Sequence, residues 1–371
     1  MKIGILTFHA SHNFGSMLQN YALQQFLMSE GHIVETINLR NDRQSYVYNF
    51  PLHIGSSCPT LRALFGRFKD PKWLVMECRR WCTFERFLKK QLVLTKEYKD
   101  WETIQKDLPQ NNYDAIIVGG DQIWNTFCYD FDKSYFLPGN IRPTQKVAFS
   151  PSFGNEIPRT KKDGVRVSKI KEFLMDFDYI SVREKDASDY LQEQLNRDVP
   201  VVADPTFIVN PSVYLKIIKE PIVKEPYIYY YTPSHLPDYE AEDIAIELAN
   251  RLNLKIVTSY PRFREKNKMM SVLSGPSEFL NLLSNAQIVM GKSYHLVIFS
   301  ILFHKTFITL KRKNDARVKS LLSQLMIGDR NMDSIDDYKH LKDIDYSVVD
   351  KELLKIRQKA ISYLNDALLQ K

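Results

Sequence analysis

Residues 289–300 read Val-Met-Gly-Lys-Ser-Tyr-His-Leu-Val-Ile-Phe-Ser, and this stretch decides the fold class. A β-type apolar run ends at Gly291, and a helix-compatible apolar run starts after His295. In open α/β sheets, ligands bind at the carboxyl ends of the strands, beside helix N-termini that favour anions. The stretch therefore predicts an α/β unit with Lys292, Ser293 and His295 at its binding edge.

Two interpretations of these side chains stay open at this point. An imidazole titrates near neutral pH, so His295 is able to act as a general acid or base. The alternative is that His295 caps the helix and that Lys292 simply points into water. Position alone does not separate the two.

The same alternation of β-type runs and helical periodicity extends along the whole chain and predicts two doubly wound α/β domains. Strands are expected at 2–8, 33–38, 113–119, 146–150, 179–183 and 199–209, then at 227–232, 254–260, 286–290 and 306–310. We assign 1–210 to an N-terminal Rossmann-like domain, 211–226 to a proline-containing linker, and 227–345 to a C-terminal Rossmann-like domain. A terminal helix at 350–371 is placed to pack back on the first domain.

Three strand ends in the first domain carry further candidate residues. The loop after the first strand offers Asn13, Gly15 and backbone N–H groups to an anion, although a tight turn also needs these residue types. Gly120 allows close backbone approach to a ligand, and Asp121 follows it as a candidate carboxylate or as a helix N-cap. Arg183 stands at a strand-to-helix junction, where a guanidinium grips phosphate or carboxylate, or forms a structural pair with a neighbouring acid.

Composition limits the partners. The chain has 371 residues, is 44% hydrophobic and carries a net charge of +7, which supports folded cores and suits anionic substrates. The positive charge is too weak and too spread to predict nucleic-acid binding. The four cysteines form no zinc motif and fit a reducing cytoplasm, and neither a signal peptide nor a membrane-spanning run is present.

Residues 72–99 are basic and aromatic, and two readings of them stay open. An amphipathic basic helix with aromatic side chains is able to lie on an anionic membrane surface. The alternative is that the aromatic stripe packs on its own domain while the basic face is solvated. The first reading predicts a cytoplasmic protein with peripheral contact at the inner face of the membrane.

Several short motifs follow one another in a fixed order. They are Thr7-Phe8-His9, Asn13-Phe14-Gly15, the run 18–24, the run 118–125, Ser152-Phe153-Gly154, Ser181-Val182-Arg183-Glu184, Asp204-Pro205-Thr206, Ser293-Tyr294-His295 and Phe299-Ser300. Together they resemble the signature of the polysaccharide pyruvyl transferase family, over residues 2–325. Leu296 stands where many members have glycine, and Ser293 where some have arginine.

The resemblance implies two Rossmann-like domains facing a central cleft, similar to GT-B glycosyltransferases, with the acceptor on the N-terminal and the donor on the C-terminal side. It implies transfer of the enolpyruvyl carbons of phosphoenolpyruvate onto two hydroxyls of one hexose, in a surface polysaccharide such as a bacterial capsule or exopolysaccharide, or in its lipid-linked precursor. The product is a pyruvate ketal, and phosphate is released. Phosphoenolpyruvate is a substrate here, so neither a cofactor nor a metal is expected.

The chemistry needs a proton donor, a base and groups that hold anions. We assign the proton to His295, with His12 as its substitute, the phosphate and carboxylate to Arg183, and the acceptor hydroxyl to Asp121. Substrate binding is expected at Asn13, Gly15, Gly120, Ser152, Lys292 and Ser293. A polar, basic loop at 261–276 is a candidate lid over the donor.

Two functions of other kinds compete with pyruvyl transfer. One is a glycosyltransferase that uses a nucleotide sugar in the same two-domain frame. The other is a binding or scaffold protein of a glycan-assembly complex that keeps the fold without the chemistry. Protection from thermal unfolding by a nucleotide, but not by phosphoenolpyruvate, would favour the first.

Overall fold

The structure is a computed structural model that describes residues 1–51, 71–154, 157, 164–233, 238–259, 269–310, 316–332 and 334–369. The chain divides into two compact units. Unit 1 comprises Met1–His12, Ser16–Val209 and Ile356–Lys371, and unit 2 comprises Asn13–Gly15 and Asn210–Lys355. Of the candidate lid at 261–276, residues up to 268 lie outside the described part of the chain.

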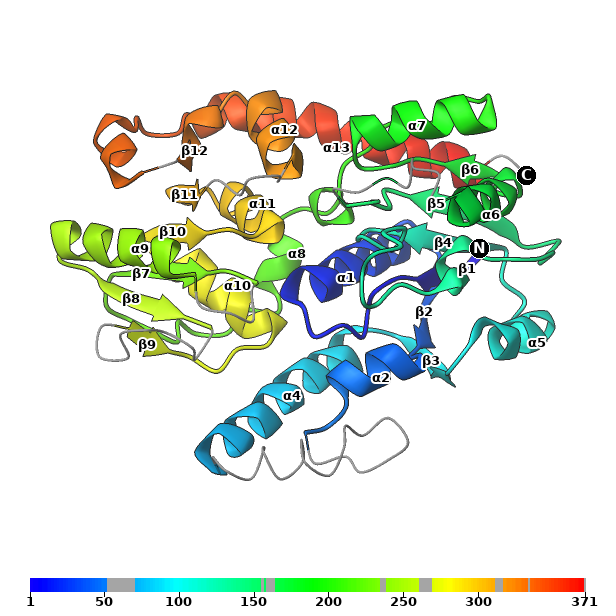
Figure 1. Cartoon of the computed structure of the whole chain (residues 1–371), viewed down its shortest axis with the longest axis horizontal. Helices are drawn as coiled ribbons and strands as arrows, with labels where there is room; N and C mark the ends of the chain where they lie inside the picture. Colours follow the sequence, from blue (N-terminus) through cyan, green and yellow to red (C-terminus); the bar gives the residue numbers. More distant parts are fainter. Residues whose placement is uncertain are drawn as a thin grey trace. The chain divides into compact units, whose positions relative to one another are not determined.

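The described part of unit 1 is built on a six-stranded parallel sheet (Figure 1). Its strands are β1 (Lys2–Leu6), β2 (Ile33–Leu39), β3 (Leu94–Tyr98), β4 (Ala115–Gly119), β5 (Gln145–Phe149) and β6 (Tyr179–Ile180), in the order β3-β2-β1-β4-β5-β6. The strand order reverses between β1 and β4. In sheets of this Rossmann type, ligands bind at that reversal.

Helices connect these strands. They are α1 (Phe14–Ser29), α2 (Asp42–Tyr48), α4 (Pro71–Gln91), α5 (Trp101–Asn111), α6 (Gly164–Met175) and α7 (Lys185–Leu195), with short 3-10 turns η1 (Lys133–Phe136) and η3 (Pro205–Phe207). Their starts follow local chemistry: Asp100, for example, accepts the N–H of Thr103 and so caps α5. Apolar side chains of the central strands and of the 123–141 segment form one continuous core.

The strand expected at 199–209 is wrong. In this stretch the structure shows only one isolated bridge, between Val182 and Val201, and then the turn η3. Pro200 and Pro205 lack an N–H and cannot donate to a ladder. The carboxylate of Asp204 instead accepts the N–H of Thr206 at 2.9 Å. Local capping therefore outweighs the apolar run.

The described part of unit 2 has a second six-stranded parallel sheet. Its strands are β7 (Tyr227–Tyr231), β8 (Lys255–Thr258), β9 (Met269–Ser271), β10 (Ile288–Gly291), β11 (Phe307–Leu310) and β12 (Asn331–Met332), in the order β12-β11-β10-β7-β8-β9. Counted within the unit, this is the same strand order as in unit 1, with the reversal between β7 and β10. Each unit is therefore a Rossmann-like domain.

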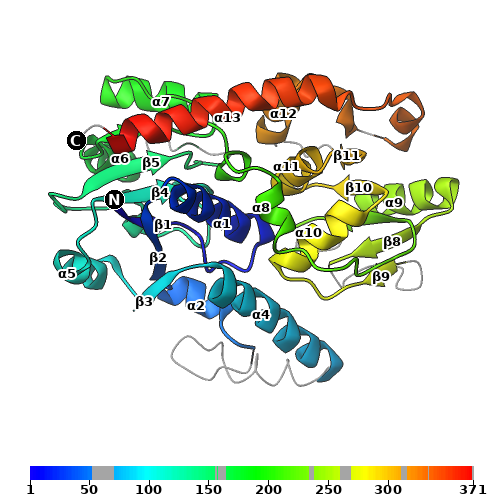
Figure 2. The same ribbon diagram turned by 180° about the vertical axis from the view of Figure 1, so that it is seen from behind.

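The helices of unit 2 include one that leaves it. They are α8 (Ser212–Leu215), α9 (Tyr239–Leu252), α10 (Pro276–Asn285), α11 (Tyr294–Leu302), α12 (Ala316–Gln324), η4 (Gly328–Arg330), η5 (Ile335–His340) and the first part of α13 (Tyr346–Leu369). From Ile356 onward, α13 belongs to unit 1 (red in Figure 2). There the Tyr363 hydroxyl donates to the Ala148 carbonyl at 2.9 Å. No helix among the described residues has the length and apolar character to cross a bilayer.

Candidate functional site

The end of β4 in unit 1 is shaped by close backbone contacts. A Cβ on Gly119 would lie 1.9 Å from the carbonyl oxygen of Phe149 on the neighbouring strand, and one on Gly120 would lie 1.6 Å from Oε1 of Gln19. Both glycines are therefore required by the packing of the protein itself. Asp121 follows directly, at the reversal of the strand order.

Asp121 is a buried carboxylate, 8% exposed. It accepts a short hydrogen bond from the hydroxyl of Ser16, in the first turn of α1, and the N–H of Gln122 at 2.7 Å. The latter bond closes a local turn, so Asp121 does not cap a helix. Its contacts hold the carboxylate at one fixed place on the sheet edge.

Arg183 reaches the same edge from the end of β6. Its guanidinium forms an ion pair with Asp204 at 2.5 Å, with the two side chains 3% and 0% exposed. It also donates to the carbonyl of Gly120. The structural pair considered from the sequence is therefore present, and the binding of phosphate by Arg183 stays a prediction.

Ser152 completes this group. Its hydroxyl donates to Glu184 at 2.5 Å and accepts the N–H of Gly154 at 2.9 Å. Its own N–H donates to the carbonyl of Asp121 at 2.9 Å. The structure thus brings together the adjacent pair Gly120 and Asp121 with Ser152 and Arg183, which lie at distant positions in the sequence.

A second carboxylate near this group was missed by the sequence analysis. Asp130 is 7% exposed and accepts the hydroxyls of Ser11 at 3.0 Å and Tyr48 at 2.9 Å. Burial raises its pKa, and the charge of Asp121 adds to this effect. Asp130 lies in an irregular segment without periodicity, so no sequence pattern indicated it.

His12, the substitute proton carrier, is enclosed in unit 1. Its ring stacks on that of Phe84, with the ring centroids 4.8 Å apart, and its Nε2 lies 3.3 Å from Oε1 of Glu85. Burial lowers the pKa of His12. For Glu85, burial acts to raise the pKa, but hydrogen bonds from His12 and Arg40 outweigh it and bring the value down to about 2. His12 is thus part of a half-buried network with Glu85 and Arg40.

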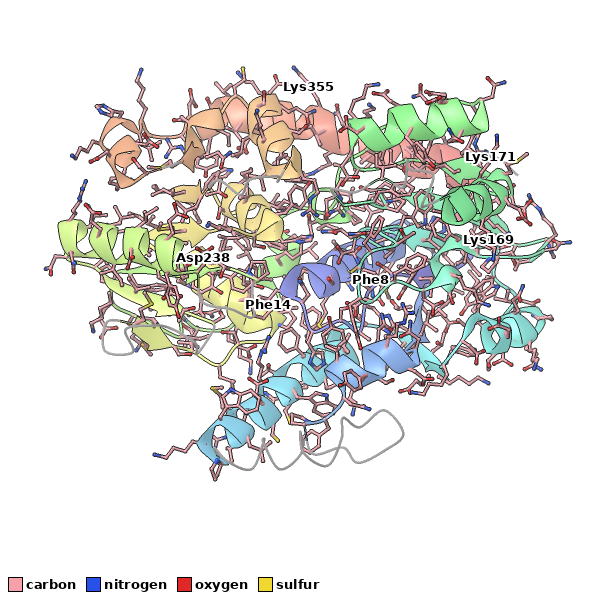
Figure 3. The ribbon with its side chains drawn as sticks, viewed as in Figure 1. Phe8, Phe14, Lys169, Lys171, Asp238 and Lys355 are labelled. Carbon is pink, nitrogen blue, oxygen red and sulfur yellow. The ribbon has the colours of Figure 1, made fainter. Side chains whose placement is uncertain are left out.

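The end of β10 in unit 2 repeats the geometry of β4. A Cβ on Gly291 would lie 1.8 Å from the carbonyl oxygen of Tyr231 on the adjacent strand β7. Lys292 follows and forms an ion pair with Asp238 at 2.8 Å, with the two side chains 11% and 26% exposed. Asp238 is also the N-cap of α9 and is labelled in Figure 3. Lys292 therefore does not simply point into water.

Helix α11 starts at this edge. Ser293 is its N-cap and accepts the N–H of Leu296 at 3.4 Å. His295 lies in the first turn and is 8% exposed. The cap is therefore Ser293 and not His295.

Residues 13–15, at the start of α1, lie beside His295 in the first turn of α11. Phe14, labelled in Figure 3, packs on Phe279 and Tyr231, with its ring centroid 4.7 Å and 5.2 Å from theirs. A Cβ on Gly15 would lie only 2.0 Å from Nδ1 of His295. The first turns of α1 and α11 thus meet at His295. The dipoles of helix N-termini favour an anion.

The side chains at the end of β4 in unit 1 and those at the end of β10 in unit 2 are suited to different chemistry. The edge in unit 1 offers fixed carboxylates, which suit the orientation or deprotonation of a hydroxyl. The edge in unit 2 offers an imidazole, a lysine and two helix starts, which suit an anion and proton transfer. Among the described residues, no group of three or more His, Cys, Asp or Glu side chains is arranged to hold a metal ion.

Residues 13–314 match the family described as polysaccharide pyruvyl transferase. A comparison with functionally curated proteins finds no significant match.

Solved structures show the same fold at low identity. UDP-GlcNAc 2-epimerase from Neisseria meningitidis, bound to UDP-GlcNAc, is 9% identical, with a TM-score of 0.54 and 100% coverage of both chains. A second similar structure, described as that of a putative UDP-N-acetylglucosamine 2-epimerase from Listeria monocytogenes, is 9% identical, with a TM-score of 0.52, 100% coverage of this chain and 90% of the other. These similarities show the fold alone.

Proposed function

The chain belongs to the polysaccharide pyruvyl transferase family, and from this premise we propose that it uses phosphoenolpyruvate as its donor. In this proposal the enolpyruvyl carbons pass to two hydroxyls of one hexose, in a surface polysaccharide or its lipid-linked precursor, and phosphate is released. In this proposal unit 2 supplies the donor contacts other than Arg183, and unit 1 supplies the acceptor contacts.

The observation that carries the proposal is the meeting of two helix starts at His295. Phosphoenolpyruvate bears a phosphate and a carboxylate, and helix N-termini favour both groups. Gly15 leaves no room for a side chain between α1 and the imidazole, since its Cβ would lie 2.0 Å from Nδ1. An acid or base held against an anion-binding position is what protonation of this donor requires.

The reaction balances as an addition followed by a substitution. A proton adds to the methylene carbon of phosphoenolpyruvate, and the first sugar hydroxyl bonds to the carbon that bears the carboxylate, losing its own proton. Phosphate then leaves with its bonding electrons. The second hydroxyl bonds to the same carbon, loses its proton and closes the ketal.

We assign the proton transfer to carbon to His295 and the orientation or deprotonation of the acceptor hydroxyl to Asp121. The short bond from Ser16 and the turn closed by Gln122 fix the Asp121 carboxylate, which supports an orienting role. Arg183 is proposed to bind the phosphate and carboxylate of the donor.

The remaining proposed contacts to substrate are backbone and side-chain groups of the same two edges. They are Asn13, Gly15, Lys292 and Ser293 on the donor side, and Gly120 and Ser152 on the acceptor side. A lipid-linked acceptor would place the protein in the cytoplasm, at the inner face of the membrane.

Phosphate release from phosphoenolpyruvate by the purified protein tests the proposal, with hexosides and lipid-linked sugars as acceptors. We expect release that depends on one class of acceptor, together with a product whose mass shows a gained pyruvate ketal. The proposal fails if no acceptor supports release and phosphoenolpyruvate gives no thermal stabilisation, while a nucleotide sugar does.

A further inference from the structure

One face of α4 in unit 1 is exposed, and five of its eight exposed residues are basic. The helix runs from Pro71 to Gln91 along the rim of the unit, beside α2 (Figures 1 and 2). Its exposed residues recur every three or four positions, which is the period of one helix face. They are Pro71, Lys72, Val75, Arg79, Cys82, Arg86, Lys89 and Lys90. We call Lys72, Arg79, Arg86, Lys89 and Lys90 the basic face of α4.

The opposite face of α4 belongs to the fold. Leu74, Phe84, Phe87 and Leu88 are buried. The indole N–H of Trp81 donates to the carbonyl of Tyr48 at 2.9 Å, which ties α4 to α2. The aromatic stripe read from residues 72–99 is therefore occupied by packing, and only the charges remain for a partner.

Among the described residues, no acid forms an ion pair with the basic face. The helix contains two glutamates: Glu77 is paired with Arg80 at 3.7 Å, and Glu85 is buried against Arg40 and His12. Within the described residues, none of the five basic side chains forms an ion pair. Lys72, Arg79 and Arg86 repeat every seven residues, so they lie nearly in line along the helix. The face is a strip of unpaired positive charge roughly 27 Å long, at 1.5 Å per residue.

We propose that the basic face of α4 binds the surface of a bilayer that contains anionic phospholipids. A flat array of negative headgroups matches a straight strip of positive charge on a fixed helix. Single-stranded RNA is a poorer partner, because the aromatic rings that would stack on bases are turned into the fold. The proposal concerns adsorption to lipid alone, and it does not depend on the pyruvyl-transfer chemistry.

The expected strength follows from the number of charges. Each lysine or arginine near an anionic surface raises the affinity by roughly fivefold at moderate ionic strength. Reversal of three charges removes this attraction and adds repulsion, so affinity is expected to fall by more than about 100-fold. Added salt weakens the binding, because the charges are exposed.

Sedimentation of the full chain with vesicles tests the proposal. The vesicles are mixtures of phosphatidylglycerol and phosphatidylcholine, with pure phosphatidylcholine as the uncharged reference. The test variant carries Arg79→Glu, Arg86→Glu and Lys89→Glu. The matched control carries Lys106→Glu, Lys169→Glu and Lys171→Glu, which change the net charge equally on exposed positions of α5 and α6 (Figure 3).

We expect the wild type and the control to bind phosphatidylglycerol vesicles in a salt-dependent way, and the α4 variant to lose this binding. Phosphate release with a water-soluble acceptor should stay unchanged in the α4 variant, which separates this test from that of the reaction. The proposal is overturned if the wild type ignores anionic vesicles, if the α4 variant still binds them, or if both triple variants lose binding equally. Preference of the wild type for RNA over vesicles would also overturn it.

Discussion

The carboxyl edges of the two sheets are built alike up to one residue and then diverge. In both units the strand beside the reversal of strand order ends in a glycine, Gly119 or Gly291, whose Cβ would lie 1.9 or 1.8 Å from a carbonyl oxygen of the adjacent strand. In unit 1 the chain continues into fixed carboxylates and the buried pair of Arg183 and Asp204. In unit 2 it continues into Lys292 and the capped helix α11 with His295.

The comparison shows how one scaffold position serves two purposes. The edge of unit 1 is closed by its own hydrogen bonds, so its side chains should matter first for stability. The edge of unit 2 gathers helix N-termini and an imidazole, so its side chains should matter first for the rate of reaction. Each prediction below tests this division.

The largest effect is expected on the rate for His295→Ala. If the imidazole transfers the proton, kcat for phosphate release should fall by about 10²–10⁴-fold, the usual worth of general acid–base catalysis. The free energy of unfolding in urea should change far less. His304→Ala is the matched control, since His304 lies in the same unit and is exposed, paired with Asp350 at 3.0 Å. Near-normal turnover in His295→Ala would move the role to another residue, His12 being the next candidate.

In unit 1 the corresponding large effect is on stability. Asp204→Ala leaves the Arg183 charge buried without its carboxylate, and loss of one partner from a buried pair costs about 3–5 kcal/mol. Asp238→Ala in unit 2 breaks a pair that is partly exposed and removes an N-cap, so its cost should stay near about 1–2 kcal/mol. Urea unfolding of both variants measures the difference. Equal losses of stability in the two variants would contradict the view that the edge of unit 1 serves stability more than the edge of unit 2.

Gly15→Ala tests the approach of α1 to the imidazole. The new methyl group would collide with the ring, and such overpacking costs about 1–3 kcal/mol and shifts the backbone. Turnover should fall as His295 is displaced. Gly328→Ala is the control, because a Cβ there meets nothing within 4 Å. Activity that survives Gly15→Ala unchanged would mean that the position of this ring is not critical.

Acid should weaken the protein through unit 1. Burial lowers the pKa of His9 from its usual 6.5 to about 4, and Nε2 of His9 lies 2.9 Å from Asn38. Between these values the unfolded chain binds the proton and the folded chain does not, so stability is full above pH 6.5 and is lost as the pH falls towards 4. From pH 7 to 5 the loss is about 2 kcal/mol.

The variant His9→Gln isolates this effect. The free energy of unfolding should fall between pH 7 and 5 in both proteins, and the fall should be about 2 kcal/mol smaller in the variant than in the wild type. His304→Gln, with an exposed ring, should keep the wild-type slope. The same slope in all three proteins would place the acid sensitivity elsewhere.

The buried strands and the edge strand β6 could be predicted from the sequence, whereas the edge strands β3, β9 and β12 could not. β1, β4 and β7 are continuous apolar runs because helices cover both faces of a parallel sheet. β3 was missed because it lies at the sheet edge, and Lys96 and Glu97 are exposed there. Its pairing with β2 depends on tertiary position and not on a run of apolar residues.

The candidate residues could be found, but not all their partners. Strand ends and motifs pointed to Asp121, Arg183 and His295, since ligand-binding side chains gather where parallel strands stop. That Gly15 lies against His295 is a contact between distant parts of the chain, which local patterns do not encode. Asp204 was placed in a strand, although its carboxylate caps a turn and holds Arg183.

The division of the chain into units limits how either unit can be exchanged as a separate module. The backbone passes from one unit to the other after His12, Gly15, Val209 and Lys355, so neither unit is a single continuous segment. A fragment that ends at residue 209 would lack 356–371, whose Arg357 donates to the Phe207 carbonyl at 2.7 Å. The complementary fragment would lack Asn13–Gly15, and with them Gly15, which lies against the imidazole of His295. The two halves are therefore interlaced in sequence, and exchange of one half between relatives must carry pieces of the other with it.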